Sequence, residues 1–384
     1  MKAVGIIAEY NPFHNGHLYH LEEAKRLAGS DVVVVAMSGN FVQRGEPAIL
    51  NKWDRTRLAL ENGADLIVEI PTLFCLGNAK QYAHAGVKTL DSLGVIDKYA
   101  FGSESDNLQK LQILADNFKS KETEITQGIK EYAKEGLSYP VARAKAYNRL
   151  FPFTNEIELL ENPNDNLAMN YLTCKSRMEP MSVKRGNFKS ASDIRYSYKI
   201  GENVSENLPE NSLKMLANSV VTFPEQWFNT LKYAIMQMTG EEIDDCPSGG
   251  EGLGNKIKHA IAQSNSWDEL IQETKSKRYT YTRISRLCMQ IVLGITRKKF
   301  PISAPAYIRL LGANEKGRNL LSYAEKNDFS KLPIIANISK NREKLSDDGL
   351  LLLELDAHAS DVYNLVTGRD ISKESDYKIP PIII

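Results

Sequence analysis

The chain of 384 residues has no long hydrophobic run and only four cysteines. No apolar stretch reaches the roughly 20 residues that a membrane helix requires. The cysteines are scattered and form no CxxC pair, which argues against both a disulfide framework and a zinc ribbon. The first residues form a strand pattern and then a charged helix pattern, not the pattern of a signal peptide. We therefore expect a cytoplasmic protein with no membrane segment.

The chain also has no net charge, because 48 lysines and arginines balance 48 aspartates and glutamates. A neutral total does not exclude a nucleic-acid partner, since local clustering of basic residues decides that question. The length allows two or three domains and a sizeable core. Nothing in the sequence indicates a protein partner.

The most informative stretch is the beginning of the chain. Residues 3–8 (AVGIIA) predict a buried strand, residues 9–15 (EYNPFHN) a polar turn, and an apolar helix pattern starts at Gly16. A loop that opens a helix favours anions, because free backbone N–H groups and the helix dipole point at it. His14 and His17 stand in this loop. Their imidazoles can donate hydrogen bonds to phosphate oxygens that gain charge in a transition state.

Two other interpretations of these histidines stay open. They could be surface residues of a polar loop. They could also belong to a metal site, because His14, His17 and His20 recur every three residues. No cysteine lies nearby, however, and catalytic zinc sites usually follow other spacings. The position after the first strand favours phosphate, and we predict no metal site.

Strand and helix patterns alternate through the first hundred residues. Residues 31–37, 65–70 and 95–101 predict further buried strands, rich in β-branched residues as in a parallel sheet covered on both faces. Turns follow these strands at Ser38, Pro71 and Gly102. The turns should gather with the His14 loop at one edge, where open α/β sheets place their ligands. The sequence thus predicts an α/β fold with a doubly wound parallel sheet.

The opening residues resemble a known family. His14-Asn15-Gly16-His17 resembles the HxGH signature of the nucleotidylyltransferases, which share a Rossmann-type nucleotide fold with class I aminoacyl-tRNA synthetases. Residues 5–21 (GIIAEYNPFHNGHLYHL) are similar to the opening of the bacterial tRNA(Met) cytidine acetate ligase family. The resemblance implies that His14 and His17 are catalytic. It also implies nucleotide contacts from the surrounding residues, Ile7, Ala8, Glu9, Tyr10, Asn11, Pro12, Phe13, Asn15, Gly16 and His20.

Later segments add to this resemblance. Residues 163–166 (PNDN) resemble a PNN-type nucleotide contact, with Asp165 in place of the second asparagine, so Asn164 is the expected contact. A predicted strand at 178–183 leads to Arg185, and residues 190–195 (SASDIR) resemble the ISxSxIR element that closes the phosphate site. The serines would also suit an ordinary helix N-cap. The expected nucleotide residues outside the opening are Gly102, Asn164, Arg185, Ser190, Ser192 and Arg195.

The second half of the chain has a different pattern. A polar linker is expected at 201–211, followed by helix patterns at 227–238, 256–263, 267–275 and 283–293. We predict a catalytic domain at 1–200 and a mainly helical RNA-binding domain at 201–384. The end of the chain, 378–384, should dock on a core.

A basic stretch in this half indicates an RNA partner. Cations suit phosphates, hydroxyls bond the backbone, and aromatic rings stack on unpaired bases. A solvated helix end would have a similar composition. Residues 275–286 (KSKRYTYTRISR) resemble the KTKRYTxxRIxR signature of the family, and 307–318 its RxLGxNxKG element. The predicted RNA contacts are Lys275, Lys277, Arg278, Tyr279, Tyr281, Arg283 and Arg286.

The resemblance implies a reaction. The family uses ATP, accompanied by Mg²⁺, to convert acetate to acetyl-adenylate, and then acetylates the wobble cytidine of elongator tRNA(Met) to N(4)-acetylcytidine. Two alternatives remain open from the sequence. One is a small-molecule nucleotidyltransferase, and the other is a noncatalytic RNA-binding factor with a degenerate nucleotide fold.

Overall fold

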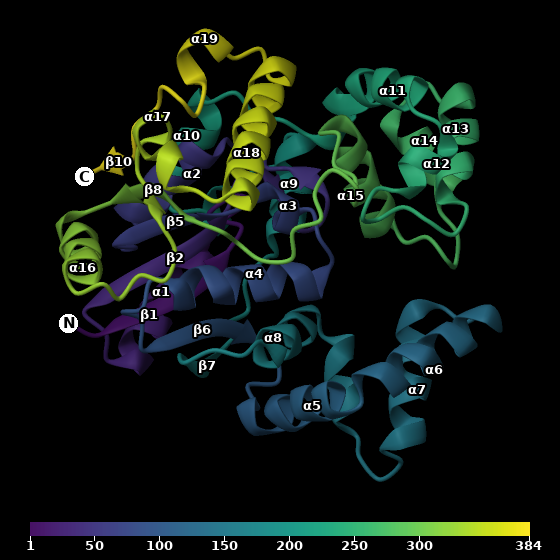
Figure 1. Cartoon of the computed structure of the whole chain (residues 1–384), viewed down its shortest axis with the longest axis horizontal. Helices are drawn as coiled ribbons and strands as arrows, with labels where there is room; N and C mark the ends of the chain where they lie inside the picture. The colour runs from purple at the N-terminus through teal and green to yellow at the C-terminus, as the bar shows by residue number, and fades with distance from the viewer.

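The computed structural model describes residues 1–384 and has a mixed β-sheet at its centre (Figure 1). The strand order is β10-β8-β5-β2-β1-β6-β7, with β9 beside β8. The strands of this sheet are β1 (Ala3–Ala8), β2 (Val32–Ser38), β5 (Leu66–Ile70), β6 (Lys98–Ser103), β7 (Glu179–Lys184), β8 (Ile308–Ala313), β9 (Ile334–Ile335) and β10 (Ile382–Ile383). A small hairpin, β3 (Phe41–Val42) and β4 (Glu46–Pro47), follows β2.

Strand β1 occupies the middle of the sheet. It pairs in parallel with β2 on one side and with β6 on the other, so that Val4 lies between Val33 and Lys98. The pairs β2–β5 and β6–β7 are also parallel. The predicted α/β class with a doubly wound parallel sheet is therefore confirmed. The predicted strand at 95–101 is displaced, because β6 runs from Lys98 to Ser103.

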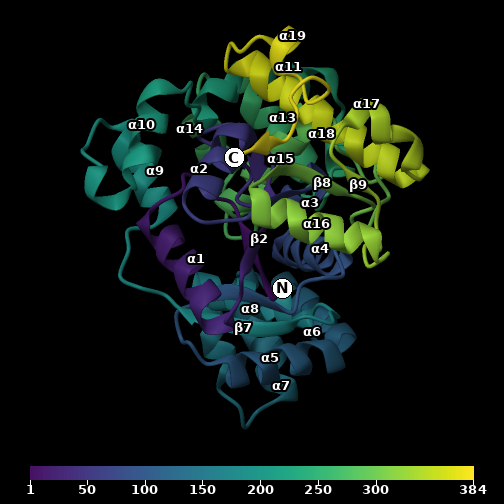
Figure 2. The ribbon, with the colours of Figure 1, turned by 90° about the vertical axis from the view of Figure 1, so that its left-hand side faces the viewer.

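Helices cover both faces of the sheet. Residues of β1 alternate between two hydrophobic cores, as the period of two requires. Ala3 belongs to the core under α4 (Ala79–Ser92) and α8 (Pro163–Thr173). Val4 and Ile6 belong to the core under α1 (Asn15–Ala28), α2 (Lys52–Glu61) and α9 (Ala191–Lys199). In Figure 2, α1 and α4 accordingly lie on opposite sides of β2.

Two groups of helices extend away from the sheet in Figure 1. The first group is α5 (Leu108–Ser120), α6 (Glu122–Lys134) and α7 (Tyr139–Leu150). The second is α11 (Phe228–Gln237), α12 (Gly240–Asp244), α13 (Leu253–Gln263), α14 (Trp267–Thr274) and α15 (Tyr281–Val292), which we call the helical lobe. The other helices of the chain are α3 (Thr72–Cys75), α10 (Glu210–Asn218), α16 (Glu315–Lys326), α17 (Ile338–Asn341), α18 (Asp347–Val366) and α19 (Ile371–Glu374). None of the helices combines the length and apolar character needed to cross a bilayer.

The last part of the chain returns to the sheet. Strand β8 pairs antiparallel with β5, and β10 pairs with β8, so residues beyond 307 complete the sheet of the first half. The division at residue 200 remains a prediction about folding units, but the sheet crosses it. Sequence patterns did not indicate β8, because its partner β5 lies about 240 residues earlier in the chain.

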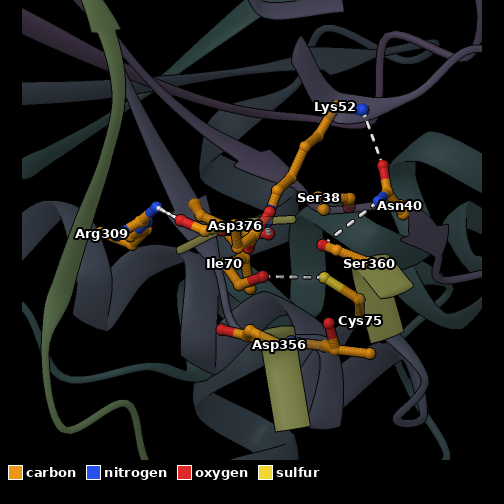
Figure 3. Close-up of polar contacts among 12 residues, drawn as sticks. Ser38, Asn40, Lys52, Ile70, Cys75, Arg309, Asp356, Ser360 and Asp376 are labelled. Carbon is orange, nitrogen blue, oxygen red and sulfur yellow. Dashed lines mark hydrogen bonds and ion pairs between the residues drawn. The ribbon is translucent and has the colours of Figure 1, made fainter. Parts of the chain in front are cut away.

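A buried ionic cluster fastens this returning segment (Figure 3). Lys52 of α2 is fully buried, and its Nζ lies 2.8 Å from Glu69 of β5 and 2.5 Å from Asp376 near the C-terminus. The guanidinium of Arg309 in β8 donates to the carbonyl of Asp376 at 3.2 Å. Removing one partner of a buried ion pair typically costs about 3–5 kcal/mol. The cluster therefore joins four segments, α2, β5, β8 and the C-terminal segment, into one unit.

Candidate nucleotide site and RNA surface

His14 begins the first helix and shapes its own loop. It is the N-cap of α1, and its Nδ1 accepts a hydrogen bond from the backbone N–H of Gly16 at 3.0 Å. The Nδ1 of His17 accepts in turn from the N–H of His14 at 3.3 Å. The two rings stack with their centroids 3.8 Å apart. Because each Nδ1 is an acceptor, the ring proton of each histidine sits on Nε2.

Both histidines are neutral at pH 7. Burial, with the positive charge of Arg185, lowers the pKa of His14 to about 4. Burial also lowers the pKa of His17, helped by repulsion from His14, His20 and Arg185. A neutral imidazole that keeps one N–H is a hydrogen-bond donor to phosphate and needs no proton from solvent. The pair is therefore set up as donors at the positive end of α1.

A second group of predicted residues meets the histidines from β6 and β7. A Cβ at Gly102 would lie 3.5 Å from Arg185 and 4.0 Å from the ring of His20, so the backbone is open to a close approach here. His20 is half-buried, and its Nε2 is buried without a hydrogen-bond partner. Burial and Arg185 lower the pKa of His20 to about 4. These three residues thus form one wall beside the His14 loop.

Asn164 lies at the start of α8, where Glu104 holds it. One Glu104 oxygen accepts from the side-chain amide of Asn164 at 2.5 Å, and the other accepts from the N–H of Asp165 at 3.0 Å. The same glutamate lies 3.9 Å from Arg185. Asp165 is fully buried and accepts from the Ser103 hydroxyl at 2.5 Å. The aspartate that replaces the family's asparagine therefore fastens α8 to the end of β6.

The late segment 185–195 packs directly on the opening loop. A Cβ at Gly16 would approach Phe188 at 3.1 Å, and Arg195 donates to the carbonyl of Asn11 at 2.7 Å. Ser190 is the N-cap of α9, as the alternative interpretation expects, and its hydroxyl donates to Asp193 at 2.7 Å. The structure thus brings both predicted phosphate elements together at one edge of the sheet.

The remaining predicted nucleotide residues follow β1 along the chain. Ile7 and Ala8 end that strand, and Tyr10 and Phe13 are buried beneath His17 with ring contacts to it. Several of the others bond to neighbouring loops rather than point into the site. Asn11 accepts from the N–H of Ile49, Asn15 donates to the carbonyl of Glu206, and Arg195 reaches Ser192. Pro12 is buried, and Gly16 is half-buried.

Sequence patterns missed Arg55, which lies under the site. It is fully buried and donates to the carbonyls of Glu9 at 2.7 Å, of Ser38 at 3.0 Å and of Gly39. One guanidinium therefore holds together the ends of β1 and β2, the strands that carry the His14 loop and the β3–β4 hairpin. Nothing in the sequence indicated this role. Arg55 stands in a helix with ordinary charged residues, and its acceptors follow two strands elsewhere in the chain.

Glu46 in the β3–β4 hairpin connects the site to the helical lobe. It lies 2.8 Å from Arg195 and accepts a hydrogen bond from the Tyr281 hydroxyl at 3.0 Å. Ser285 of α15 donates to the carbonyl of Gly45 at 2.7 Å, and Arg286 donates to that of Gln43. The start of α15 is thus docked on the hairpin next to the phosphate elements.

The predicted RNA contacts divide into two groups. Lys275, Lys277 and Arg278 are exposed and have no ion-pair partner. Tyr279 is buried between the cations of Lys256 and Arg283, and its hydroxyl donates to the carbonyl of Glu251. The other group bonds to the rest of the chain. Tyr279 and Arg283 donate to carbonyls of the helical lobe, and Tyr281 donates to Glu46 of the hairpin.

Arg286 differs from both groups. Its Nε is buried without a hydrogen-bond partner. Burial and repulsion from Arg283 lower its pKa to about 10, so it is still charged at pH 7. It therefore contributes a cation at the junction between the lobe and the hairpin.

Comparison with known proteins places these features in a family. The model of the HIGH Nucleotidyl Transferase family matches residues 1–378. A tRNA(Met) cytidine acetate ligase of Clostridium perfringens is 37% identical, with both chains covered completely. The protein of the same name from Thermoanaerobacter pseudethanolicus is 38% identical over 95% of each chain.

Solved structures agree with the sequence relatives. A crystal structure of Thermotoga maritima TmcAL bound with alpha-thio ATP has a TM-score of 0.92, with 34% identity and complete coverage of both chains. A structure of the Thermotoga maritima protein without ligand has a TM-score of 0.93. The chain described here therefore belongs to the tRNA(Met) cytidine acetate ligase family of the HIGH nucleotidyl transferases.

Proposed function

We propose that the chain is an ATP-dependent ligase that acetylates the wobble cytidine of elongator tRNA(Met), with acetate as the acyl donor. The observation that carries this proposal is the meeting of the His14–His17 loop with the 185–195 segment at the carboxyl edge of β1. Such an edge is where open α/β sheets bind nucleotides. The family membership supplies acetate, cytidine and tRNA(Met) as the other reactants.

In the first step, the acetate carboxylate attacks the α-phosphate of ATP, giving acetyl-adenylate and pyrophosphate. Attack on phosphorus depends mainly on positioning and charge stabilisation, not on a covalent enzyme nucleophile. His14 and His17 would donate to the triphosphate through Nε2, and Arg185 would supply positive charge. Gly102 and Asn164 would contact the nucleoside, with the unpartnered Nε2 of His20 beside it.

Mg²⁺ would enter with ATP rather than bind the chain alone. No group of three His, Cys, Asp or Glu side chains is gathered as a set of metal ligands. Magnesium in nucleotide sites commonly keeps waters and binds substrate phosphates, so this arrangement fits an ATP-borne ion. When bound, the ion would neutralise phosphate charge.

The tRNA would approach along the exposed cations of the helical lobe. Lys275, Lys277 and Arg278 are the proposed phosphate contacts, and Arg286 is a further cation near the hairpin. Tyr279, Tyr281 and Arg283 would support this surface from within. We propose a cytoplasmic location, because the reaction consumes ATP and tRNA.

Acetate-dependent exchange of pyrophosphate into ATP tests the first step. The wild-type protein should catalyse the exchange, and His14→Ala or His17→Ala should reduce it at least about 100-fold, because each removes a donor to developing charge. Glu22→Ala on the exposed side of α1 is the control and should leave the rate unchanged. Normal exchange in both histidine variants would contradict the assignment.

A further inference from the structure

Glu9, for which the resemblance implies a nucleotide contact, also has a position that suits a second role. It directly follows β1, and the alternation of that strand aims it at the face covered by α4. Gly5 and Ile7, four and two residues earlier, contact Leu90 and Gly86 of that helix, respectively. His14 begins α1, which covers the opposite face. Glu9 therefore lies at the top of the central strand, across the sheet from the helix that carries the phosphate-binding histidines.

The chain holds Glu9 firmly but leaves half of its carboxylate free. Oε1 accepts a hydrogen bond from the backbone N–H of Gln43 at 2.9 Å. Its own backbone carbonyl accepts from Arg55 at 2.7 Å. Oε2 accepts no hydrogen bond from within the chain. A fixed carboxylate with one open oxygen has the geometry of a proton acceptor.

The surroundings favour a basic carboxylate. Burial raises the pKa of Glu9 above its ordinary value, although Arg195 of α9 and Arg44 of the hairpin oppose the shift. Glu46 of β4 raises it further. The other titratable groups that face it are Tyr82 of α4, Tyr171 of α8 and Arg55 of α2. A raised pKa strengthens a carboxylate as a base while leaving it ionised at higher pH.

We propose that Glu9 is the general base of the acetyl-transfer step, a catalytic residue that accepts a proton from the exocyclic amine of the cytidine. The proposal rests on the proposed function. The amine nitrogen attacks the carbonyl carbon of acetyl-adenylate, and a C–N bond forms. The bond between that carbon and the phosphate oxygen breaks, and AMP leaves with the electron pair. The nitrogen loses one proton to Oε2 of Glu9, which later releases it to water.

The geometry argues against a direct phosphate contact. A carboxylate repels the phosphates of ATP, and no cation forms an ion pair with Glu9. A purely structural role would require only the acceptor for the Gln43 N–H. Glutamine also provides that acceptor through its amide oxygen, so the two roles can be separated by one substitution.

The test compares the two half-reactions in Glu9→Gln. Acetate-dependent exchange of pyrophosphate into ATP should fall far less than transfer, because this step needs no base and any lost nucleotide contact weakens both half-reactions equally. Transfer from preformed enzyme-bound acetyl-adenylate to tRNA, followed in a single turnover, should fall at least about 100-fold. Glu242→Gln is the matched control, since Glu242 also accepts a backbone N–H, from Thr239, but lies in α12. It should leave both steps unchanged.

The pH profile gives a second readout. In the wild type the transfer rate should rise with pH through an ionisation above the ordinary range of a glutamate, and this limb should be absent in Glu9→Gln. Loss of exchange in Glu9→Gln, or transfer at the wild-type rate, would overturn the role. Absence of both half-reactions in the wild type would instead overturn the proposed function, and the inference with it.

Discussion

At the residue scale, His14 has a structural role as a helix cap and a proposed chemical role as a hydrogen-bond donor. The two roles can be separated by substitution. Its Nδ1 caps α1, while its Nε2 proton is available to a ligand. Sequence patterns predicted the ligand but not the cap, because histidine is not among the residues preferred at an N-cap. The cap explains why this ring is fixed before ATP arrives. Burial and the positive charge of Arg185 lower the pKa of the side chain and keep it neutral.

The lowered pKa values predict a loss of stability in mild acid. The ordinary pKa of His14 is 6.5 and its folded value is about 4, so the unfolded chain binds more protons between these limits. Stability should therefore fall as pH decreases from about 7 toward 4, and His20 adds to this in the same direction. Thermal unfolding between pH 7.5 and 5 measures the effect.

His14→Asn separates the cap from the chemistry. Asparagine is a good N-cap, so the variant should keep a melting temperature near that of wild type at pH 7.5. Because it removes one titrating group, its melting temperature should depend less on pH. The same variant should lack pyrophosphate exchange. A pH dependence equal to that of wild type would refute the folded pKa of His14 near 4.

At the element scale, the contact of α15 with the β3–β4 hairpin joins the two proposed substrate regions. Gly45 has φ of +83°, and a Cβ there would collide with the backbone of Arg286. Gly201 has a similar φ of +80° with nothing within 4 Å. The two glycines share the backbone requirement and differ only in the packing against α15.

This pair predicts unequal costs for alanine. Gly201→Ala should destabilise the protein by about 1 kcal/mol, the cost of a left-handed non-glycine residue. Gly45→Ala should cost about 3 kcal/mol, because overpacking adds to the same strain. Urea unfolding followed by circular dichroism compares them, and the fluorescence of Trp227 and Trp267 reports on the region of the lobe. Equal losses would mean that α15 yields freely at this contact.

The elements also show what sequence patterns can predict. The β-branched runs located β2 and β5 to within a residue, because a buried parallel strand is apolar throughout. Helix patterns likewise found α11 and α14 to within about a residue. Sequence patterns did not predict strand β8, because it pairs with β5, which lies far away in the sequence. Lys52 and Arg55 looked like an exposed helix start, yet both are fully buried, since their partners come from other strands and from the C-terminus.

Sequence motifs predicted which residues of the candidate site lie together. They did not predict which side chains are buried, because burial depends on the packing of other helices. The His14 loop and the 190–195 segment meet as the resemblance implied. The composition of the basic stretch predicts RNA contacts, and this stays a prediction. Composition did not reveal that Tyr279 is buried or that Arg283 donates to the carbonyls of Ser248 and Gly249. The helices packed against such a segment determine which of its side chains are exposed to solvent.

At the scale of the whole molecule, the neutral net charge is compatible with the proposed local RNA surface, because the exposed cations of that surface are clustered. Replacing Lys277 and Arg278 together by alanine should weaken tRNA binding and reduce the salt dependence of log K by about 1 to 2. Exchange of pyrophosphate should be unchanged, because both side chains are exposed on the lobe. Lys2→Ala with Arg26→Ala, exposed residues before β1 and near the end of α1, is the control. An unchanged salt slope would exclude these cations as phosphate contacts.

The central claim is that one chain activates acetate and delivers it to tRNA. Incubation of the protein with ATP, labelled acetate and tRNA, followed by digestion of the RNA to nucleosides, tests it most directly. We expect labelled N(4)-acetylcytidine that requires ATP and disappears with His14→Ala. ATP turnover with unlabelled tRNA would instead indicate a small-molecule nucleotidyltransferase. Binding of tRNA with neither adenylation nor label would contradict catalysis altogether.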